Sequence, residues 1–504
     1  MPASPAPLIA LLAASPGAAV RLEGMRWYDG VGGGPRTEPL GLRGGRFAGD
    51  PGPGAPVVSL DGWCLLPGLC DAHLHLFHLA RARLAVDLAG TVRRDELWRR
   101  LEEGAPAVGP ALGVGWDESA WDEARFPTRA ELDERFPDRP AGLVRVCGHV
   151  AVANGPALAL LAEAGHAGDA STGLLLEGDA AALAPLLEPE PAAQREAVMA
   201  AAAELARAGL TAVTDMGSHR LPEKAAALPA DFPLRLDYFH AGEPAEIPPD
   251  AGGPARPLGR KFFLDGSIGG RTAALGEPYV DGGRGELLWE DAGLERALGE
   301  TFGAGRRAAL HAIGDDATAQ ALRCLERAGA PPDRARLEHV EIVREGQLDA
   351  LLRLGVAVCI QPNFLDRWGR PGGLYEQRLG PGYRARFHGP GALRRAGLPL
   401  AYGTDGMPAR LWAALRAACD EDLFGADADR PADALAAVTG DAARLAGRAE
   451  RGRVAEDQAA DFCLLPGDPV AARFADEPEV ALTVLGGRPT WIHPRWQGRP
   501  PCDA

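Results

Sequence analysis

Paired cysteines, long apolar runs and an excess of positive charge are all absent from this 504-residue chain. Its eight cysteines include no Cys-x-x-Cys pair, which argues against a disulfide framework and against a thiolate zinc site. No run of 18 or more apolar residues occurs, so we expect no membrane span. The formal net charge of −16 disfavours nucleic acid and anionic membrane surfaces as partners. We therefore expect a cytoplasmic protein with reduced thiols that acts on a small molecule.

Basic residues are also missing ahead of the apolar segment at residues 6–13, where a secretory signal would carry them. We expect a loose N-terminal extension there rather than a signal peptide. Lysine itself is rare, because the chain places nearly all its positive charge on arginine and has lysine only at Lys224 and Lys261. Lys261 opens an apolar run, which indicates a task that arginine cannot perform.

The hydrophobic content of 46% is enough for a large core, and the length suggests more than one domain. Short strand patterns between glycine-rich turns occupy about residues 19–64, and similar patterns recur at about residues 452–484. We expect these two ends of the chain to form one small β-sandwich, from residues 1–66 and 448–504.

Helical and strand patterns alternate from about residue 191 to residue 405, which predicts a parallel sheet with right-handed crossovers. About eight strands fit a closed (β/α)8 barrel of the TIM type better than a doubly wound sheet. No Gly-x-Gly-x-x-Gly follows the first strand. We assign the barrel to residues 67–447, with an inserted α/β segment after its first strand at about residues 80–190.

His73 and His75 lie at the end of an apolar strand pattern that breaks at Pro67-Gly68, where we expect the chain to leave the sandwich and enter the barrel. Alternate residues of a strand face the same side, so both imidazoles can reach one metal ion. Asp71 shares this face and could orient them. The alternative is a polar pair that faces solvent, because a single His-x-His is a weak signal.

Later strand patterns also carry polar residues at or near their carboxyl ends, namely His311, His339 and Asp405, and Lys261 joins this set although it fits least well, because it opens its apolar run. In a (β/α)8 barrel these ends meet at one mouth, where such enzymes place their chemistry. Each residue has a simpler interpretation when taken alone, and Asp405 before Gly406 is also typical of a turn. The joint pattern predicts a metal or acid–base site.

Lys261 adds a second kind of chemistry to this set. A desolvated lysine can lose its proton, whereas arginine cannot, and a neutral amine can capture CO2 as a carbamate that bridges two metal ions. The alternative is an ion pair at the base of the barrel.

With these residues in place, the chain resembles the amidohydrolase superfamily and, within it, the YtcJ-like metal-dependent hydrolases of amidohydrolase family 3. The matching stretches, in family order, are residues 66–75 (Leu-Pro-Gly-Leu-Cys-Asp-Ala-His-Leu-His), 115–117 (Gly-Trp-Asp), 148–149 (Gly-His), 261–275 (beginning Lys-Phe-Phe-Leu-Asp-Gly), 311–315 (His-Ala-Ile-Gly-Asp), 338–339 (Glu-His) and 403–406 (Gly-Thr-Asp-Gly). With the terminal strands, the similarity covers nearly the whole chain.

The resemblance implies one or two divalent ions, usually zinc. Their ligands would be His73, His75, His311, His339 and Asp405, with Lys261 as an N6-carboxylated bridge. Asp405 would also take a proton from the attacking water and return it to the leaving nitrogen. Imidazole and carboxylate ligands suit zinc on chemical grounds as well.

Five residues around the expected mouth are candidates for substrate binding, and each has a plainer interpretation. Trp116 could be a core aromatic residue, His149 a satisfied strand histidine, Asp265 part of a turn, Arg271 a surface ion pair and Gln361 a strand-end cap. The chain also departs from the family at Cys147, where an Asp often precedes Gly-His, and at Phe364, where many members have histidine. Both changes touch the expected pocket, so the resemblance does not transfer a substrate.

The expected activity is hydrolysis of an amide-type C–N bond, as in an amide, formamide or cyclic amide. One alternative is a metal-dependent deaminase of a heterocycle, but such enzymes commonly carry a Glu shortly after the histidine that corresponds to His311, and Ala-Ile-Gly-Asp follows here. The other alternative is a non-catalytic metal-binding or ligand-binding barrel, which would not need Asp405 as a proton shuttle. The oligomeric state stays open, a homo-oligomer included.

Overall fold

The computed structural model describes residues 4–118, 121, 123, 125–146, 150–344 and 346–497. The chain divides into two compact units, one formed by residues 1–76 and 202–504 and the other by residues 77–201. Within the described ranges, no helix has the length and apolar character needed to cross a membrane.

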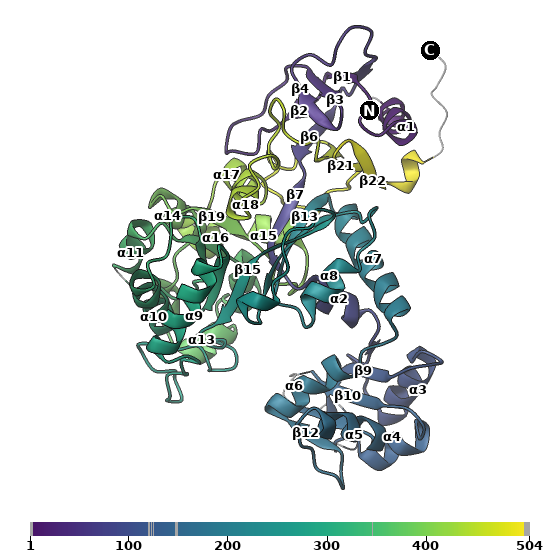
Figure 1. Cartoon of the computed structure of the whole chain (residues 1–504), viewed down its shortest axis with the longest axis vertical. Helices are drawn as coiled ribbons and strands as arrows, with labels where there is room; N and C mark the ends of the chain where they lie inside the picture. Colours follow the sequence, from purple (N-terminus) through teal and green to yellow (C-terminus); the bar gives the residue numbers. More distant parts are fainter. Residues whose placement is uncertain are drawn as a thin grey trace. The chain divides into compact units, whose positions relative to one another are not determined.

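Eight parallel strands form the central barrel of the first unit (Figure 1). Each strand neighbours the next along the chain, from β7 to β13 and onward to β19. The strands are β7 (Leu69–Leu74), β13 (Leu210–Met216), β14 (Arg235–His240), β15 (Ala255–Phe263), β16 (Arg307–Ala312), β17 (Ala335–His339), β18 (Ala357–Ile360) and β19 (Leu400–Tyr402). This arrangement confirms the predicted (β/α)8 barrel.

The first and last strands of the sheet meet and close the barrel. The backbone N–H of Asp405 donates to the carbonyl of His73 at 2.7 Å. Gly403 makes this approach possible, because a Cβ atom there would lie 2.5 Å from the backbone nitrogen of His73. The ends of β7 and β19, which carry three of the predicted site residues, are therefore held against each other.

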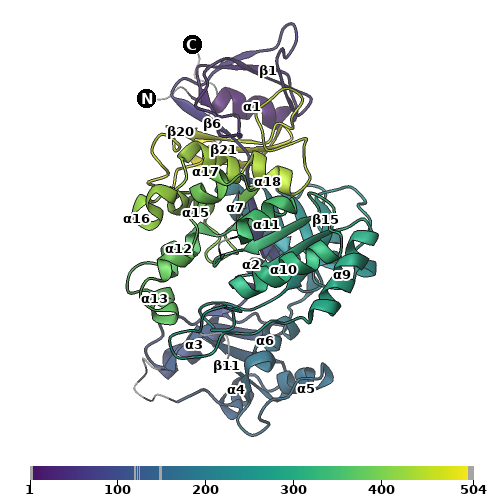
Figure 2. The same ribbon diagram turned by 90° about the vertical axis from the view of Figure 1, so that its left-hand side faces the viewer.

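Helices surround the barrel and connect successive strands. Figure 2 shows α9, α10 and α11 side by side, and α9 and α10 pack on β16. The helices of this unit that follow the insertion are α7 (Pro191–Arg207, which begins in the other unit), α8 (Leu221–Ala226), α9 (Asp291–Gly303), α10 (Asp315–Arg327), α11 (Gln347–Arg353), α12 (Pro362–Trp368), α13 (Leu374–Leu379), α14 (Pro390–Arg395), α15 (Leu411–Ala418), α16 (Glu421–Phe424), α17 (Pro431–Ala437) and α18 (Gly440–Leu445).

Strand β15 starts earlier than the sequence pattern predicts. The apolar run opens at Lys261, but the strand begins at Ala255 and pairs with β14 from there. Two arginines, a proline and a glycine interrupt its first half and hide the apolar pattern. Lys261 consequently lies near the carboxyl end of its strand, on the side of the barrel that carries the histidines.

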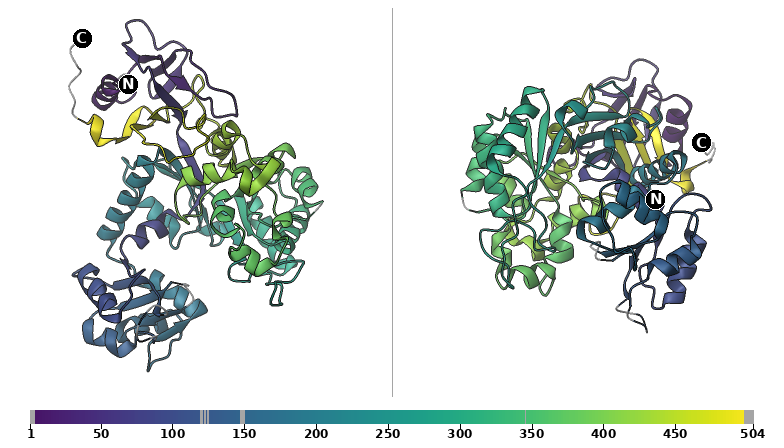
Figure 3. Two further views of the ribbon diagram at one scale, coloured as in Figure 1. Left: turned by 180° about the vertical axis from the view of Figure 1, so that it is seen from behind. Right: turned by 60° about the horizontal axis from the view of Figure 1, so that its bottom comes forward.

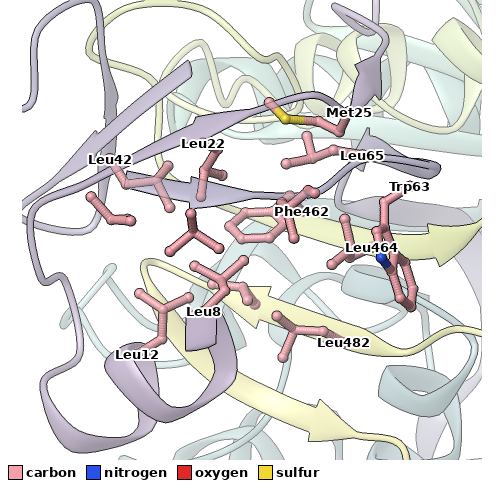
Figure 4. Packing of buried hydrophobic residues seen from close by; sticks show 14 of the residues in the cluster. Leu8, Leu12, Leu22, Met25, Leu42, Trp63, Leu65, Phe462, Leu464 and Leu482 are labelled. Carbon is pink, nitrogen blue, oxygen red and sulfur yellow. The ribbon is translucent and has the colours of Figure 1, made fainter. Parts of the chain in front are cut away.

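Both ends of the chain build the predicted terminal β layers. One sheet has the order β4-β3-β1-β5 and the other β2-β6-β20-β21-β22. Their strands are β1 (Val20–Glu23), β2 (Arg26–Trp27), β3 (Leu40–Arg43), β4 (Arg46–Ala48), β5 (Val57–Ser59), β6 (Trp63–Pro67), β20 (Phe462–Pro466), β21 (Leu482–Leu485) and β22 (Arg488–Ile492). Figure 4 shows side chains from both chain ends in one apolar core, including Leu22, Leu65, Phe462 and Leu482.

The passage from the sandwich into the barrel occurs at Gly68, between β6 and β7. A Cβ atom at this position would lie 2.2 Å from Oγ1 of Thr211 on β13, so only glycine fits there. Strand β6 pairs with β20, whereas β7 pairs with β13, and the two strands therefore belong to different layers. One nearly continuous stretch of chain thus links the terminal layers to the first barrel strand.

The N-terminal segment is not the loose extension that the sequence pattern suggested. Residues Ala6–Ala14 form helix α1, and Leu8, Ile9 and Leu12 are buried in the sandwich core (Figure 4). Positions 8 and 12 are four residues apart, so they lie on one helix face. The packing of α1 on β22 was not visible from the sequence, because the two elements lie more than 470 residues apart in the chain.

We expect Leu12→Ala to destabilise the sandwich by about 2–3 kcal/mol, because it removes a fully buried side chain and leaves a cavity. Hydrogen exchange of the β22 amides measures this effect, and exchange should become faster in the variant. Leu352→Ala on α11 is the matched control, since Leu352 is 37% exposed and its loss should change stability by less than about 0.5 kcal/mol. Equal exchange in the two variants would contradict the packing of α1.

The second unit is a separate α/β layer, drawn in blue in Figure 3. Its sheet has the order β12-β11-β10-β9-β8, and apolar clusters are buried in it. The strands are β8 (Val86–Asp87), β9 (Ala111–Trp116), β10 (Ala141–Arg145), β11 (Val150–Ala153) and β12 (Leu174–Leu176). The helices are α2 (Leu76–Ala82), α3 (Arg94–Gly104), α4 (Arg129–Arg135), α5 (Gly155–Glu163) and α6 (Glu177–Leu186).

Candidate metal centre and active site

Four histidines and one aspartate gather at the carboxyl ends of the barrel strands. The ring of His73 lies 5.8 Å from that of His75 and 4.8 Å from that of His339, measured between ring centroids. The ring of His311 lies 4.5 Å from that of His339. Ligand atoms of His73, His339 and Asp405 all lie within 4.8 Å of one another. The fold therefore brings together the residues that the strand ends predicted.

The orientation of His73 is fixed by a buried carboxylate. Its Nδ1 lies 2.7 Å from Oε2 of Glu338, and both side chains are almost fully buried. Burial raises the pKa of Glu338, but the guanidinium of Arg336 and then His73 lower it below its ordinary value. An ionised carboxylate can only accept, so Nδ1 of His73 carries a hydrogen and donates it to Glu338. Burial lowers the pKa of His73, but Asp405 raises it above its ordinary value, which favours a proton on Nε2 that a bound metal ion would displace.

Nε2 of His73 faces an oxygen of Asp405. Oδ1 of Asp405 lies 3.4 Å from Nε2 of His73 and 3.2 Å from Nε2 of His75. Burial raises the pKa of Asp405, yet the neighbouring histidines, His73 first, hold it well below its ordinary value. A carboxylate oxygen and two imidazole nitrogens in this arrangement require a cation or a proton between them.

His339 presents a nitrogen without a partner. The side chain is 3% exposed, and Nδ1 has no hydrogen-bond partner among the described residues. Burial, followed by the nearby His311 and His73, holds the pKa of His339 well below its ordinary value, so the ring is neutral. Neutral imidazole is the form that binds metal.

The backbone at the site is held in the left-handed region. His339 has φ 74°, Val340 φ 50° and Asp405 φ 55°. Residues other than glycine adopt such backbone angles at a cost of about 1–3 kcal/mol each, and residues strained in this way cluster at functional sites. Consecutive residues of a regular strand face opposite sides, but this turn of the backbone lets both Glu338 and His339 face the site.

Lys261 lies in the same buried cluster. It is 2% exposed, and its Nζ has no hydrogen-bond partner within the described part of the chain. Burial lowers the pKa of Lys261 to about 8, although Glu338 and Asp405 act in the opposite direction. The centroid of the Phe263 ring lies 5.1 Å from Nζ. With a pKa of about 8, roughly a tenth of this amine is neutral at pH 7 and able to react as a nucleophile.

His311 is oriented by the loop that follows β15. Its Nε2 lies 2.9 Å from the carbonyl of Gly266, and a carbonyl only accepts, so Nε2 donates and Nδ1 keeps the lone pair. Burial lowers the pKa of His311 to about 3. His311 is consequently neutral and suited to metal binding.

Asp265 braces this loop against the end of β16. Its carboxylate accepts backbone N–H groups of Ile313 at 3.0 Å, Gly314 at 2.8 Å and Ala274 at 3.0 Å. Burial raises the pKa of Asp265 to about 7, against these three hydrogen bonds. Asp265 is 2% exposed and binds residues almost 50 positions away, so it does more than stabilise a local turn before Gly266.

A divalent metal fits the chemistry of these residues. Ligand atoms of His73, His339 and Asp405 lie within 4.8 Å of one another, the ring of His311 lies beside that of His339, and buried nitrogens of His339 and Lys261 have no partner among the described residues. Imidazole nitrogen and carboxylate oxygen form the donor set that zinc prefers. Cys359 also lies near His73 and Glu338, but burial raises the pKa of its thiol well above the ordinary value, so it stays protonated.

Glu338 is the functional residue that the sequence interpretation missed. Arg336 and Glu338 are two residues apart in β17, on either side of the apolar Leu337, so their side chains share the barrel interior. That charged pair was the available signal. Asp71, expected to orient the histidine rings, acts on the backbone instead. Its carboxylate accepts the N–H of His73 at 3.1 Å and both the N–H and hydroxyl of Thr404, at 3.0 and 2.6 Å.

The predicted substrate contacts fall in different environments. Trp116 is fully buried in the second unit, where it stacks on Trp121. Arg271 is 46% exposed and pairs with Asp281. Gln361 is 4% exposed, and its Oε1 has no hydrogen-bond partner among residues that the structure describes. His149 lies outside the described residues. The role of these side chains in substrate binding stays a prediction.

Phe364 forms an aromatic wall beside the histidines. Its ring stacks on His339 with a centroid distance of 5.9 Å and an interplanar angle of 14°. Phe364 also contacts Trp368 edge to face at 4.8 Å. The aromatic ring therefore makes this side of the site apolar where many related chains would offer another imidazole.

Known proteins share both the sequence pattern and the fold. The model described as "Amidohydrolase family" matches residues 56–491. YtcJ of Bacillus subtilis (strain 168), named as an amidohydrolase, is 28% identical over 495 residues that cover 86% of this chain and 90% of YtcJ. N-substituted formamide deformylase of Arthrobacter pascens is 34% identical over 119 residues, which are 23% of this chain and 22% of that enzyme. The crystal structure of an uncharacterised metal-dependent hydrolase from Pyrococcus horikoshii OT3 matches with a TM-score of 0.78 and 26% identity, over 91% of this chain and 99% of that one.

Proposed function

Because this chain belongs to the amidohydrolase family and is a metal-dependent hydrolase, we propose that it cleaves an amide-type C–N bond of a small molecule. The observation that carries the proposal is the gathering of His73, His311, His339 and Asp405 at one end of the barrel, with the buried Lys261 beside them. The substrate would be an amide, a formamide or a cyclic amide.

The protein would hold one or two divalent ions, which we propose to be zinc. His73, His75, His311, His339 and Asp405 would be the ligands, and Lys261 would bridge two ions if it is carboxylated. A bound ion would lower the pKa of an attacking water to about 7 and polarise the substrate carbonyl. The neutral state of His311 and His339 supports this ligand set, since protonated imidazole cannot bind metal.

Asp405 is the proposed proton shuttle. Its pKa lies well below the ordinary value, so the side chain is an ionised carboxylate whose oxygens can accept hydrogen bonds from the attacking water. Water adds its oxygen to the acyl carbon, Asp405 passes the proton to the nitrogen, and the C–N bond breaks to give an acid and an amine. Glu338 and Asp265 keep His73 and His311 in place during this reaction.

The comparison with N-substituted formamide deformylase supports an amide-type substrate, because part of that enzyme is similar to this chain. The residues after His311 support the same choice over a deaminase, since Ala-Ile-Gly-Asp offers no glutamate at the position discussed above. Phe364 favours a substrate with an apolar group on that side of the site.

An activity screen of zinc-loaded protein tests the proposal. We expect release of acid and amine from formamides, N-acyl amines or cyclic amides, and no ammonia from aminopurines or aminopyrimidines. Protein stripped by a chelator is the control, and its activity should return when zinc is added back. Ammonia release without amide hydrolysis would identify a deaminase, and metal-loaded protein inactive on every compound would contradict an enzymatic role.

A further inference from the structure

A cavity lies at the opposite end of the barrel from the histidines. It has a volume of about 510 Å³ and is lined by residues at the amino ends of β16, β17 and β18 and by α18 and the segment after it. All of its lining belongs to the first unit. The catalytic proposal assigns no role to this cavity.

Arginine dominates the cavity wall. Seven of its lining residues are arginines, and only Asp333 and Asp441 are acidic. Three more carboxylates pair with arginines of the wall, because Asp237 pairs with Arg448 and Arg451, Glu450 with Arg448, and Glu338 with Arg336. Even with these five acids counted against seven arginines, two positive charges remain in excess. This is unusual in a chain whose net charge is −16.

Three of the lining arginines have no acidic partner in the described part of the chain. Arg307 donates to the carbonyl of Leu445 at 3.1 Å, and Arg334 donates to the carbonyl of Gly305 at 2.7 Å. Arg453 is exposed at the cavity, and among the described residues its side chain has neither an acidic partner nor a hydrogen bond to a carbonyl. Burial, followed by the charges of Arg334 and Arg256, lowers the pKa of Arg307. The guanidinium groups therefore repel one another, and Asp333 acts in the opposite direction on Arg307 without reversing the shift.

Two buried arginines of the wall also have unused donors. Arg336 is 3% exposed and Arg451 is 4% exposed, and Nη1 of each has no hydrogen-bond partner among the described residues. A buried N–H group without an acceptor is costly, so such groups indicate that a partner is missing. An anion in the cavity would place acceptor oxygens and negative charge beside these groups.

We propose that this basal cavity is a binding site for a small anionic molecule that carries phosphate or carboxylate groups. The planar guanidinium fork matches both groups through paired hydrogen bonds. The volume fits a small metabolite and excludes a macromolecule from the cavity itself. The bound anion would join the amino ends of the strands to α18 and the segment that follows.

Calorimetric titration of the full-length metal-loaded protein tests this site. The probes are inorganic phosphate, fructose 1,6-bisphosphate and succinate, each against sodium chloride at the same ionic strength. We expect one-to-one binding of at least one probe, and the comparison of phosphates with succinate identifies the preferred group. The affinity should fall as salt is raised, because charge attraction is screened.

Arg307→Gln and Arg453→Gln locate the binding. Each removes one charge from the cavity and should weaken binding by at least about tenfold. Arg453 is exposed, so its replacement leaves the fold intact and keeps the test valid even if Arg307→Gln is unstable. Arg296→Gln on the exposed side of α9 is the matched control and should bind like the unmodified protein. The proposal is overturned if no probe binds better than chloride, or if both cavity variants bind as tightly as the control, since the anion then lies elsewhere.

Discussion

Asp405→Asn should lower kcat/KM by about 10²–10⁴-fold, which is the usual contribution of a positioned proton-transfer group. Asparagine keeps the size and one oxygen of the side chain but cannot accept the proton of the attacking water. Because His73, His75, His311 and His339 remain as donors, we expect the protein to keep bound metal. The measurement pairs steady-state kinetics on an amide substrate found in the screen with metal analysis of the same sample.

Asp349→Asn is the matched control for this change. Asp349 is exposed on α11, and the same replacement there should leave both kinetics and metal content unchanged. If Asp405→Asn retains full turnover, the proton shuttle must be another group. Loss of metal together with activity would instead show that Asp405 acts mainly as a ligand, so the two readouts separate its two proposed roles.

Glu338→Gln should both weaken metal binding and destabilise the barrel. The neutral amide no longer matches Arg336, and breaking a fully buried ion pair from one side costs about 3–5 kcal/mol. The same change loosens the hydrogen bond that orients His73, and loss of such a partner typically lowers metal affinity by about 10–100-fold. Metal titration by competition with a chromophoric chelator and denaturant unfolding measure the two effects separately.

The pH dependence gives a further check on Glu338. Its folded-state pKa lies below the ordinary value of 4.5, so its stabilising contribution is present above pH 4.5 and is lost as the pH falls through the lower folded value. The unmodified protein should therefore lose this stability on acidification, whereas Glu338→Gln has none to lose. Glu326→Gln is the control, because the Glu326–Arg353 pair is exposed and should be worth at most about 1 kcal/mol. If Glu326→Gln lowers the free energy of unfolding as much as Glu338→Gln does, burial of the Glu338–Arg336 pair does not explain its effect on stability.

The strand pattern predicted much of the site because two simple rules govern it. Alternation along a strand puts His73 and His75 on one face, and parallel barrel strands bring their carboxyl ends to one mouth. These rules need only the residue types and their places in the chain. They predicted that His311, His339 and Asp405 lie near one another, and the structure places His339 beside both of the others.

The same rules could not supply contacts between distant segments. The bond between Glu338 and His73 joins residues 265 positions apart, and nothing in the local pattern of either strand specifies it. Lys261 looked misplaced until β15 proved to start at Ala255, since the inserted proline and arginines mask the strand. Helix α1 looked like a loose segment because its apolar partners come from the other end of the chain.

By itself, the sequence determined the barrel, the terminal β layers and the candidate metal ligands, because these follow from local periodicity and from the chemistry of each residue type. Only the tertiary structure decided which ring nitrogen of His73 and of His311 has a protein partner, how Asp265 and Glu338 hold those rings, and that seven arginines line a cavity at the barrel's other end. The physical reason is that hydrogen bonding, burial and charge balance depend on distances between strands, and closure of the barrel sets those distances.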